Sequence, residues 1–468
     1  MLFNSLIFTV FLPIVFILYW ITPPKYRNYF LLLASYYFYY SYNPWFLLLL
    51  IGTSAADYLL AKQISATEKQ KRKKIFLALS LAGNLGVLFI YKYFVFFYNS
   101  SVEILDLKSS ILNQFIIPAG LSFYTFQSLS YTIDVYRGKY RADDKFSDFL
   151  LFVSFFPHMV AGPIVRYNDL MPQFKIITYF KNINWQQFAT LVIWGYFKKL
   201  VIADNLNLIV TPVFNNVTAF SGFELLLAGF LFVIQVYCDF SGYSDIATGV
   251  AKLFNINLTL NWRRPLFSRS LHEFWQRNHI SITTWFRDYL YIGMGGNRVT
   301  YNRWLLNIFL VFVISSFWHG ANITFIIWGT LHGLFYIAEV LLRKKFPAVK
   351  VPAFLGHLYL LGFHTATLIA FRANSFLDLR SIYKSIFSFG SWNFSLQALL
   401  SYQDRLYFVI MAFSIFILFM KEVNEEYAII NKHKTTYAFL KPTVYIFFVI
   451  LIFILGNFSA NTFIYFQF

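Results

Sequence analysis

Long apolar segments follow one another along almost the whole chain, and they constrain the fold more than any other feature. About 20 apolar residues span a membrane as a helix, and segments of that length, or nearly so, lie at roughly 2–22, 28–42, 45–61, 75–98, 111–133, 147–161, 185–211, 222–253, 304–341, 353–371, 405–420 and 440–460. The sequence therefore predicts an all-α polytopic membrane protein with about eleven transmembrane helices plus re-entrant and interfacial helices. No long polar linker, low-complexity tract or fixed-period repeat interrupts it, so we expect a single membrane domain over residues 1–468.

The composition agrees with a lipid environment. Charged residues make up 13% of the chain, whereas soluble domains carry about 25%. The net charge is +18, but the basic residues cluster in loops between the apolar segments, as topology-setting charges do. This distribution argues against nucleic acid as a partner and favours contact with anionic lipid headgroups.

The basic loops also predict a topology in the cell membrane. The loop at 62–74 carries the densest cluster, formed by Lys62, Lys69, Lys71, Arg72, Lys73 and Lys74. We expect this loop to be cytoplasmic and, from the count of crossings, the C-terminal sequence FIYFQF to be extracytoplasmic. The N-terminal segment has no basic stretch and no small-residue cleavage site, so it is expected to be a retained first helix.

His319 lies in the uncharged, strongly apolar segment SSFWHGANITFIIWGTLHG, at 315–333. An ionisable group at membrane depth is costly and by default indicates a functional site. Arginines at 263–303 and a basic cluster at 343–350 flank this segment, so both of its ends are expected on the cytoplasmic side. The segment 304–341 then forms a hairpin whose turn, at Trp318, His319 and Gly320, borders a cavity.

A second unusual stretch, EFWQRNHISITTWFRDYLYIGMGGNR at 273–298, is too polar to cross lipid and predicts amphipathic helices at the cytoplasmic interface. His272 and His279 are seven residues apart and would share one helical face, with Gln276 between them. No local carboxylate or cysteine completes a metal set, so we expect no metal and a hydrogen-bonded structural His272. The glycine turn at 293–298 is either a structural turn or a phosphate cradle.

Other ionisable residues in apolar segments have simpler interpretations. Asp239 and Asp245 are six apart and face different directions on a helix, which favours capping or ion pairing with an arginine. The single Cys238 excludes an internal disulfide and is expected to be a buried, inert thiol. His158 and His332 are expected to support helix packing.

Taken together, these motifs resemble the membrane-bound O-acyltransferases, in particular their branch similar to bacterial alginate O-acetyltransferase. The resemblance covers nearly the whole chain and rests on the two stretches above together with PAGLSFYTFQSLSYTIDVYRG at 118–138, FFPHMVAGPIVRY at 155–167, YCDFSGYSDIATGVAKLF at 237–254 and the closing FIYFQF. Two positions depart from the pattern. Asn278 stands where the branch usually has Trp, and Gly293 where it usually has Pro.

The resemblance implies a fold and an activity. It implies a ring of helices around a central funnel, with the catalytic histidine at His319 and a second functional histidine at His279. The expected reaction transfers an acyl group, in this branch acetyl, from a cytoplasmic thioester such as acetyl-CoA to a hydroxyl of an extracytoplasmic polysaccharide or of a relay partner. An extracytoplasmic esterase-like protein is an expected partner, and no bound cofactor is expected.

Each site residue has an expected role within that reaction. His319 acts as general base on the acceptor hydroxyl, because imidazole titrates near neutrality. His279 and Arg287 position or admit the anionic donor. The residues expected to support the site are Phe317 and Trp318 as walls of the acyl channel, Asn322 as a hydrogen-bond partner of His319 or the oxyanion, and Asn278, Trp285 and His332.

Two alternatives stay open. One is D-alanyl transfer from a carrier protein to teichoic acid, which belongs to the same enzyme class. The other is a polytopic transporter or flippase, which would be expected to show weak symmetry between its halves. No such symmetry is apparent in the sequence.

Overall fold

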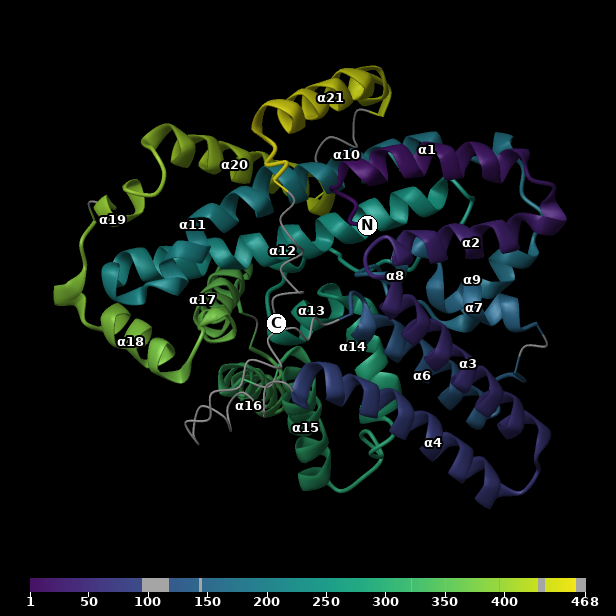
Figure 1. Ribbon diagram of the computed structural model, residues 1–468. Helices are drawn as coiled ribbons and strands as arrows, with labels where there is room; N and C mark the ends of the chain where they lie inside the picture. Colours follow the sequence, from purple (N-terminus) through teal and green to yellow (C-terminus); the bar gives the residue numbers. More distant parts are fainter. Residues whose placement is uncertain are drawn as a thin grey trace, which may run out of the picture. The chain divides into compact units, whose positions relative to one another are not determined.

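The computed structural model describes residues 1–94, 118–142, 145–320, 322–349, 351–394, 396–427 and 434–459, the side chains of 434–441 excepted. Every regular element among these residues is a helix, so the predicted all-α class is confirmed (Figure 1). The chain forms two compact units: unit 1 comprises Met1–Val192 and Ser244–Leu260, and unit 2 comprises Ile193–Tyr243 and Asn261–Phe468. The single domain stays a prediction.

Unit 1 is built mostly from the N-terminal helices. Its elements are α1 (Leu6–Ile21), η1 (Pro24–Tyr26), α2 (Arg27–Tyr40), α3 (Pro44–Ala66), α4 (Gln70–Leu88), η2 (Phe89–Phe94), α6 (Leu121–Tyr136), α7 (Phe146–Ser154), α8 (Phe156–Met159), α9 (Tyr167–Lys175), η3 (Phe180–Asn182) and most of α10 (Trp185–Tyr196). Polar caps fix where helices begin. Ser5 accepts a hydrogen bond from the backbone N–H of Phe8, and Asn43 accepts one from Trp45 beside Pro44.

A buried carboxylate ties three helices of unit 1 together. Asp57 of α3 is 1% exposed. One of its oxygens accepts from Ser80 Oγ at 2.6 Å, both accept from Asn84 Nδ2 at 2.9 and 2.8 Å, and the second accepts from Ser128 Oγ. Burial of a carboxylate is tolerated when its hydrogen bonds are made inside the protein. This cluster therefore fixes α3, α4 and α6 to one another.

Unit 2 contains the remaining elements. These are η4 (Phe197–Ala203), α11 (Asp204–Asn215), η5 (Val217–Ala219), most of α12 (Gly222–Lys252), η6 (Pro265–Phe267), α13 (Leu271–Arg277), α14 (Ile280–Trp285), η7 (Phe286–Tyr291), α15 (Tyr301–His319), α16 (Ile323–Lys345), α17 (Ala353–Arg372), α18 (Phe376–Phe387), η8 (Phe389–Ser391), α19 (Gln397–Leu400), α20 (Arg405–Tyr427) and α21 (Lys434–Leu455).

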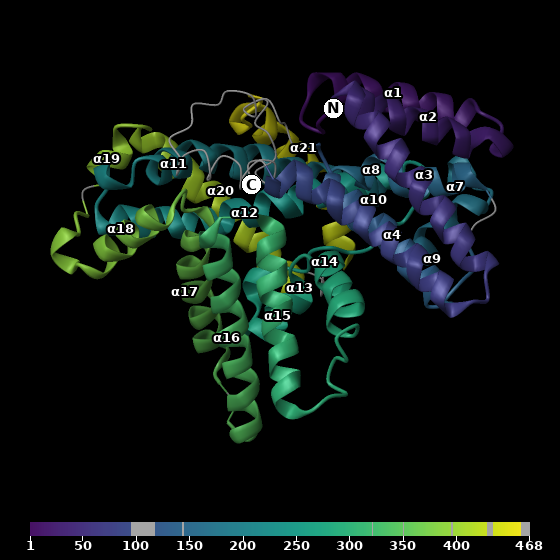
Figure 2. The same cartoon turned by 60° about the horizontal axis from the view of Figure 1, so that its bottom comes forward.

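The hairpin predicted for 304–341 is confirmed. Helix α15 ends at His319, α16 begins at Ile323, and the two pack side by side, with α17 against α16 (Figure 2). The backbones approach so closely at Gly329 that a Cβ there would lie 2.3 Å from the Cβ of Ser316. Only glycine fits this contact. The side of the membrane on which the hairpin begins and ends stays a prediction.

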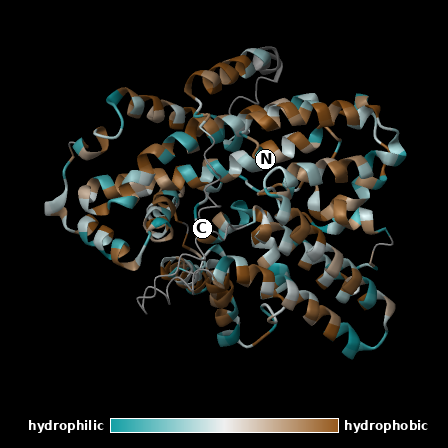
Figure 3. Ribbon diagram, in the orientation of Figure 1, coloured by the Kyte–Doolittle hydropathy of each residue, from teal (hydrophilic) through white to brown (hydrophobic). Residues whose placement is uncertain are grey.

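Six helices of the described residues are long and apolar enough to cross a membrane: α3, α4 with η2, α12, α16, α17 and α20. Two shorter apolar helices lie at Leu6–Ile21 and Pro442–Leu455. Hydrophobic residues dominate the helices in Figure 3, whereas the start of α4, which carries part of the basic cluster of the 62–74 loop, is hydrophilic. The membrane character is thus supported, and the count of eleven spans is not confirmed. The FIYFQF terminus lies outside the described residues.

Asp239 forms the expected ion pair, although with a lysine. Lys199 Nζ lies 2.6 Å from Asp239 and 2.8 Å from Asp204, and all three side chains are buried. The neighbouring Cys238 is fully buried, as predicted. These groups therefore hold η4, α11 and α12 together within unit 2.

Candidate active site

Unit 2 contains a cavity of about 810 Å³ that is open on one side. Its wall is formed by side chains of α12, the loop before η6, α13, α14, η7, α15, α16 and α17. Five histidines line it: His272, His279, His319, His332 and His364. The sequence predicted a cavity with His319 at its wall, and the structure brings both predicted catalytic histidines to that one cavity.

His319 sits at the end of α15 inside an aromatic enclosure. Its ring contacts those of Trp318, Trp328 and Phe371, with centroids 4.8, 5.3 and 5.2 Å away. The helix ends here because the chain turns extended at Gly320, where a Cβ would lie 2.4 Å from the ring of Phe325. The imidazole is thus fixed by packing on several sides while still facing the cavity.

His279 is held in a strained backbone conformation. It occupies the N-cap position of α14 with a φ of 44°, in the left-handed region that non-glycine residues rarely adopt. Its Nδ1 lies 3.2 Å from Asn261 Oδ1, which also accepts hydrogen bonds from the N–H and the hydroxyl of Ser281. An amide oxygen only accepts, so Nδ1 donates and the ring lone pair lies on Nε2.

The environment of His279 keeps the ring neutral. It is 6% exposed and packs between Phe240 and Trp262, with centroids 5.4 and 5.6 Å away. Burial lowers the pKa of His279 to about 3, since the charged imidazolium loses its hydration. At neutral pH this imidazole is therefore a hydrogen-bonding group and carries no charge.

The expectation that His272 and His279 share a helical face is wrong. Helix α13 ends at Arg277, and the chain turns before α14 begins. The break is stabilised by pairing with the 261–263 segment, where Ile280 N–H donates to Asn261 O at 2.8 Å and Arg263 N–H donates to Arg277 O at 2.9 Å. The break therefore depends on residues distant in sequence.

His272 is the hydrogen-bonded structural histidine that the sequence predicted. Its Nδ1 lies 2.7 Å from the hydroxyl of Tyr336 and its Nε2 lies 2.9 Å from the amide nitrogen of Gln276. Burial, and next the charge of Arg343, lower its pKa. His158 belongs to unit 1 and is buried beside Gln127, with 3.0 Å between their side-chain nitrogens.

Of the other predicted site residues, some line the cavity and some do not. Asn278, Arg287 and His332 line the cavity, and Phe317, Trp318 and Trp285 are not among its lining residues. Trp318 is buried against His319, and Trp285 packs on Phe286 and Tyr289. Arg287 is 60% exposed and pairs with Asp288 at 2.8 Å, so it lies at the solvent edge of the site.

Asn322 and the glycine turn at 293–298 both make hydrogen bonds within the fold. The amide of Asn322 caps α16 by accepting from Thr324 N–H at 3.1 Å and donates to Asn374 O at 2.9 Å, and its expected role toward His319 or the oxyanion stays a prediction. In the glycine turn, the backbone N–H groups of Met294, Gly295 and Gly296 donate to carbonyls just before them. These three amides are used within the turn, which favours the structural alternative.

Some site residues were missed by sequence reasoning. His364 lies in the apolar segment 353–371 and reaches the cavity from α17. The rule that singled out His319, an ionisable group within an apolar segment, would also have found it. Asn261 carried no local signal, because its role depends on pairing with a segment about twenty residues away. Among the described residues, no group of three or more metal-binding side chains is present.

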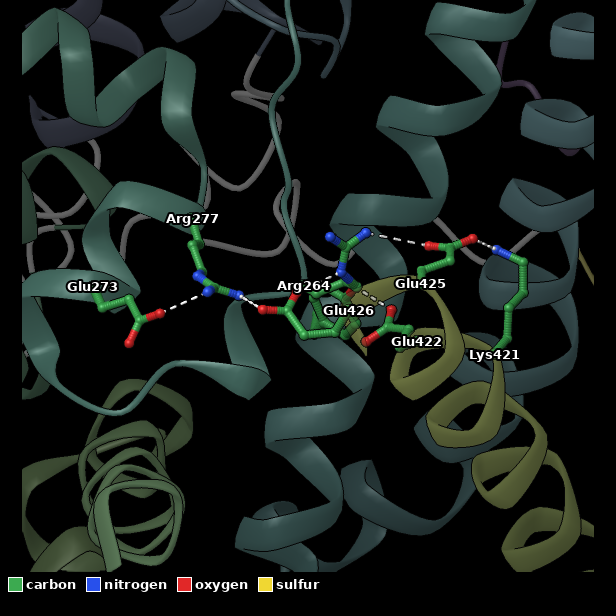
Figure 4. Close-up of polar contacts among 8 residues, drawn as sticks. Arg264, Glu273, Arg277, Lys421, Glu422, Glu425 and Glu426 are labelled. Carbon is green, nitrogen blue, oxygen red and sulfur yellow. Dashed lines mark hydrogen bonds and ion pairs between the residues drawn. The ribbon is translucent and has the colours of Figure 1, made fainter. Parts of the chain in front are cut away.

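An ion-pair network joins Arg264 and α13 to α20 (Figure 4). Glu426 accepts from Arg264 Nε and Arg277 Nη1, both at 2.8 Å, and Arg277 Nη2 lies 2.6 Å from Glu273. The adjacent Glu422 accepts from the hydroxyl of the cavity residue Tyr237. The network therefore anchors the segment that carries His279 to the C-terminal part of unit 2.

Comparison with known proteins agrees with this geometry. Residues 140–377 match the membrane-bound O-acyltransferase (MBOAT) family. The chain is 37% identical to the probable alginate O-acetylase AlgI of Pseudomonas aeruginosa, covering 84% of this chain and 76% of that protein. It is 34% identical to the peptidoglycan O-acetyltransferase of Helicobacter pylori, covering 71% and 69%. It is also 28% identical to the teichoic acid D-alanyltransferase of Streptococcus thermophilus, covering 48% and 58%.

The chain belongs to the membrane-bound O-acyltransferase family, and it is an O-acyltransferase. The family assignment favours the enzyme over the transporter or flippase that the sequence had left open. His319 and His279, the two positions that the sequence resemblance marked as functional, both line the cavity, and their catalytic roles stay predictions.

Proposed function

We propose that the protein transfers an acetyl group from a cytoplasmic thioester, acetyl-CoA, to a hydroxyl of an extracytoplasmic polysaccharide, directly or through an extracytoplasmic esterase-like partner. The observation that carries this proposal is that His319 and His279 line one cavity of about 810 Å³ within unit 2. The names of the alginate and peptidoglycan relatives support acetyl as the group and a cell-envelope glycan as the acceptor.

The reaction needs one base and one positioned thioester. His319 removes the proton of the acceptor hydroxyl as its oxygen attacks the thioester carbonyl carbon. The C–O bond forms, the C–S bond breaks, and the proton passes from the imidazolium to the departing thiolate. Packing by Trp318, Trp328 and Phe371 supports this role, because a fixed base in a water-poor site needs little reorganisation.

His279 takes a different role in the proposal. Its neutral ring, oriented through Asn261, is suited to hydrogen bonding and poorly suited to taking up a proton. We assign it to positioning of the donor in the cavity. Arg287, at the solvent edge, contacts the anionic part of the donor, since guanidinium groups form strong hydrogen bonds with phosphates.

D-Alanyl transfer is the second candidate function. The similarity to a teichoic acid D-alanyltransferase extends over 48% of this chain. The two functions differ in the donor, because D-alanyl transfer requires an aminoacyl carrier protein.

The deciding experiment uses purified protein in lipid with radiolabelled acetyl-CoA and an alginate oligosaccharide or muropeptide acceptor. Label should enter the acceptor, and His319→Ala should reduce transfer by roughly 10²- to 10⁴-fold, the usual range for a lost general base. His319→Ala protein that kept more than about a tenth of the activity would contradict the base role. Transfer from D-alanyl carrier protein alone would favour the second candidate.

The proposed topology places the 62–74 loop in the cytoplasm and the C-terminus outside. A single cysteine at residue 70, in a Cys238→Ser background, should resist an impermeant thiol reagent in intact cells and react after permeabilisation. Labelling of residue 70 in intact cells would reverse the orientation.

A further inference from the structure

Four aromatic side chains, three of them buried and Trp275 partly buried, form a continuous group on one wall of the cavity in unit 2. Trp275 comes from α13, Trp328 and His332 from α16, and His364 from α17. The His332 ring lies 4.7 Å from that of Trp328, 5.4 Å from that of Trp275 and 5.5 Å from that of His364, centroid to centroid. All four residues line the cavity. We call them the indole–imidazole cluster.

Five polar ring atoms of this cluster are buried and have no hydrogen-bond partner in the protein. They are Nε1 of Trp275, Nε1 of Trp328, both ring nitrogens of His332, and Nε2 of His364. His332 is 0% exposed and His364 3%. Buried polar atoms are nearly always paired, so five unpaired ones around a single cavity call for a ligand that completes them.

The types of these atoms define the chemistry of that ligand. An indole N–H only donates, and a neutral imidazole offers one donor and one acceptor. The cluster contains no carboxylate, ammonium or guanidinium group, whereas a site for an anion would be expected to contain a cation. The fitting ligand is therefore an uncharged segment with acceptor oxygens, from carbonyl or hydroxyl groups. The aromatic faces supply its apolar contacts.

The position of the cluster relates it to the reaction centre. Trp328 touches the ring of His319, with centroids 5.3 Å apart. Trp328 and His332 are four residues apart and lie on one face of α16, so His332 lies about 6 Å further along the helix than Trp328. On α16 the cluster thus extends about one helical turn beyond the ring that touches the proposed base.

We propose that the indole–imidazole cluster is a substrate-binding subsite that holds the uncharged, oxygen-bearing part of a substrate beside His319. This inference rests on the proposed acyl transfer. Two sources share the required chemistry: the amide-bearing arm of the thioester donor and the hydroxyl-bearing sugar of the acceptor. A subsite of this kind would select substrates by hydrogen bonding and not by charge.

The test separates the two sources by equilibrium binding. Acetyl-CoA and an alginate oligosaccharide are titrated separately against the full-length His319→Ala protein, which binds without turnover. Trp275→Phe and Trp328→Phe, added to that background, remove one N–H each while retaining an aromatic ring. Each should weaken the binding of one probe by about 3- to 10-fold, the effect of one hydrogen bond. His332→Phe removes two nitrogens and should weaken it further. The probe affected identifies the source.

Trp392→Phe is the matched control. Its Nε1 donates to Ile386 O at 3.0 Å, and it does not line the cavity. Trp392→Phe reduces the ring by the same amount as Trp328→Phe, but it also removes a hydrogen bond within the protein. Substrate-free protein should therefore lose more Tm with Trp392→Phe than with Trp328→Phe, and both probes should bind as before.

Three results would contradict the inference. Unchanged affinity of both probes in the cluster variants would overturn it and leave the proposed function intact. Loss of Tm in Trp328→Phe equal to the control, again with unchanged affinity, would assign the polar atoms to structural water. Failure of both probes to bind any protein with an intact cluster would remove the proposed function, and this inference with it.

Discussion

Two buried polar clusters in this molecule differ in where their hydrogen bonds go. In unit 1, both oxygens of Asp57 accept hydrogen bonds from neighbouring side chains. In unit 2, the nitrogens of His332 have no protein partner, and the residue lines a cavity. Both clusters are buried among apolar helices, so burial alone does not distinguish them. The difference in pairing separates a cluster that the fold uses from one that a ligand can use.

The largest expected effect on stability concerns the paired cluster. Asp57→Leu should lower the free energy of unfolding by roughly 3 kcal/mol or more, because Ser80, Asn84 and Ser128 would lose their acceptor in a buried site. Thermal unfolding in detergent measures this as a fall in Tm. Asp57→Asn keeps one acceptor oxygen and should lose less. An unchanged Tm for Asp57→Leu would break the comparison.

The next effect follows from His279, whose Nδ1 is paired and whose ring is buried. Its folded pKa, about 3, is below the unfolded value of about 6.5, so protonation favours the unfolded state. Stability is full above pH 6.5 and falls as the pH drops towards 3, by about 2 kcal/mol at pH 5. Unfolding measured against pH should show this loss. His279→Gln, which does not titrate, should show a smaller loss, and identical pH profiles would contradict the prediction.

The smallest effect concerns a cluster that is paired but partly exposed. Arg277→Gln removes two ion pairs of the network in Figure 4 and should cost about 1 kcal/mol, since exposed ion pairs contribute little. The difference in Tm from the unsubstituted protein should shrink as salt is raised. Lys139→Gln, which removes an ion pair with Asp134 in unit 1, is a control outside the network. If Arg277→Gln lowered the free energy of unfolding by several kcal/mol, the prediction would be contradicted, and the network would resemble the buried Asp57 cluster instead.

Sequence reasoning succeeded where local pattern decides the structure. The helical class follows from the lengths of the apolar segments, and the α15–α16 hairpin follows from basic residues on both sides of 304–341. His319 could be found because an ionisable residue stands out in an apolar segment. His364 obeys the same rule and was missed only because no motif drew attention to it.

Sequence reasoning failed where contacts between residues distant in sequence decide the structure. The chain break before His279 contains no glycine or proline, and it exists because Asn261 pairs with Ile280 and Ser281. The direction of the Asn322 side chain likewise depends on Asn374, about fifty residues away. Helical periodicity carries no information on either contact.

The close contact at Gly329 has a consequence for how this enzyme could change during evolution. Trp328 and His332 each precede a glycine, Gly329 and Gly333, that packs on α15. Any side chain at Gly329 would push α16 away from α15 or slide it along, and both rings would shift relative to His319. The backbone contact between α15 and α16 therefore fixes the distance between His319 and the subsite. Changes in substrate preference would then come from substitution of the ring-bearing residues of the subsite, since their distance from His319 is set by the backbone contact.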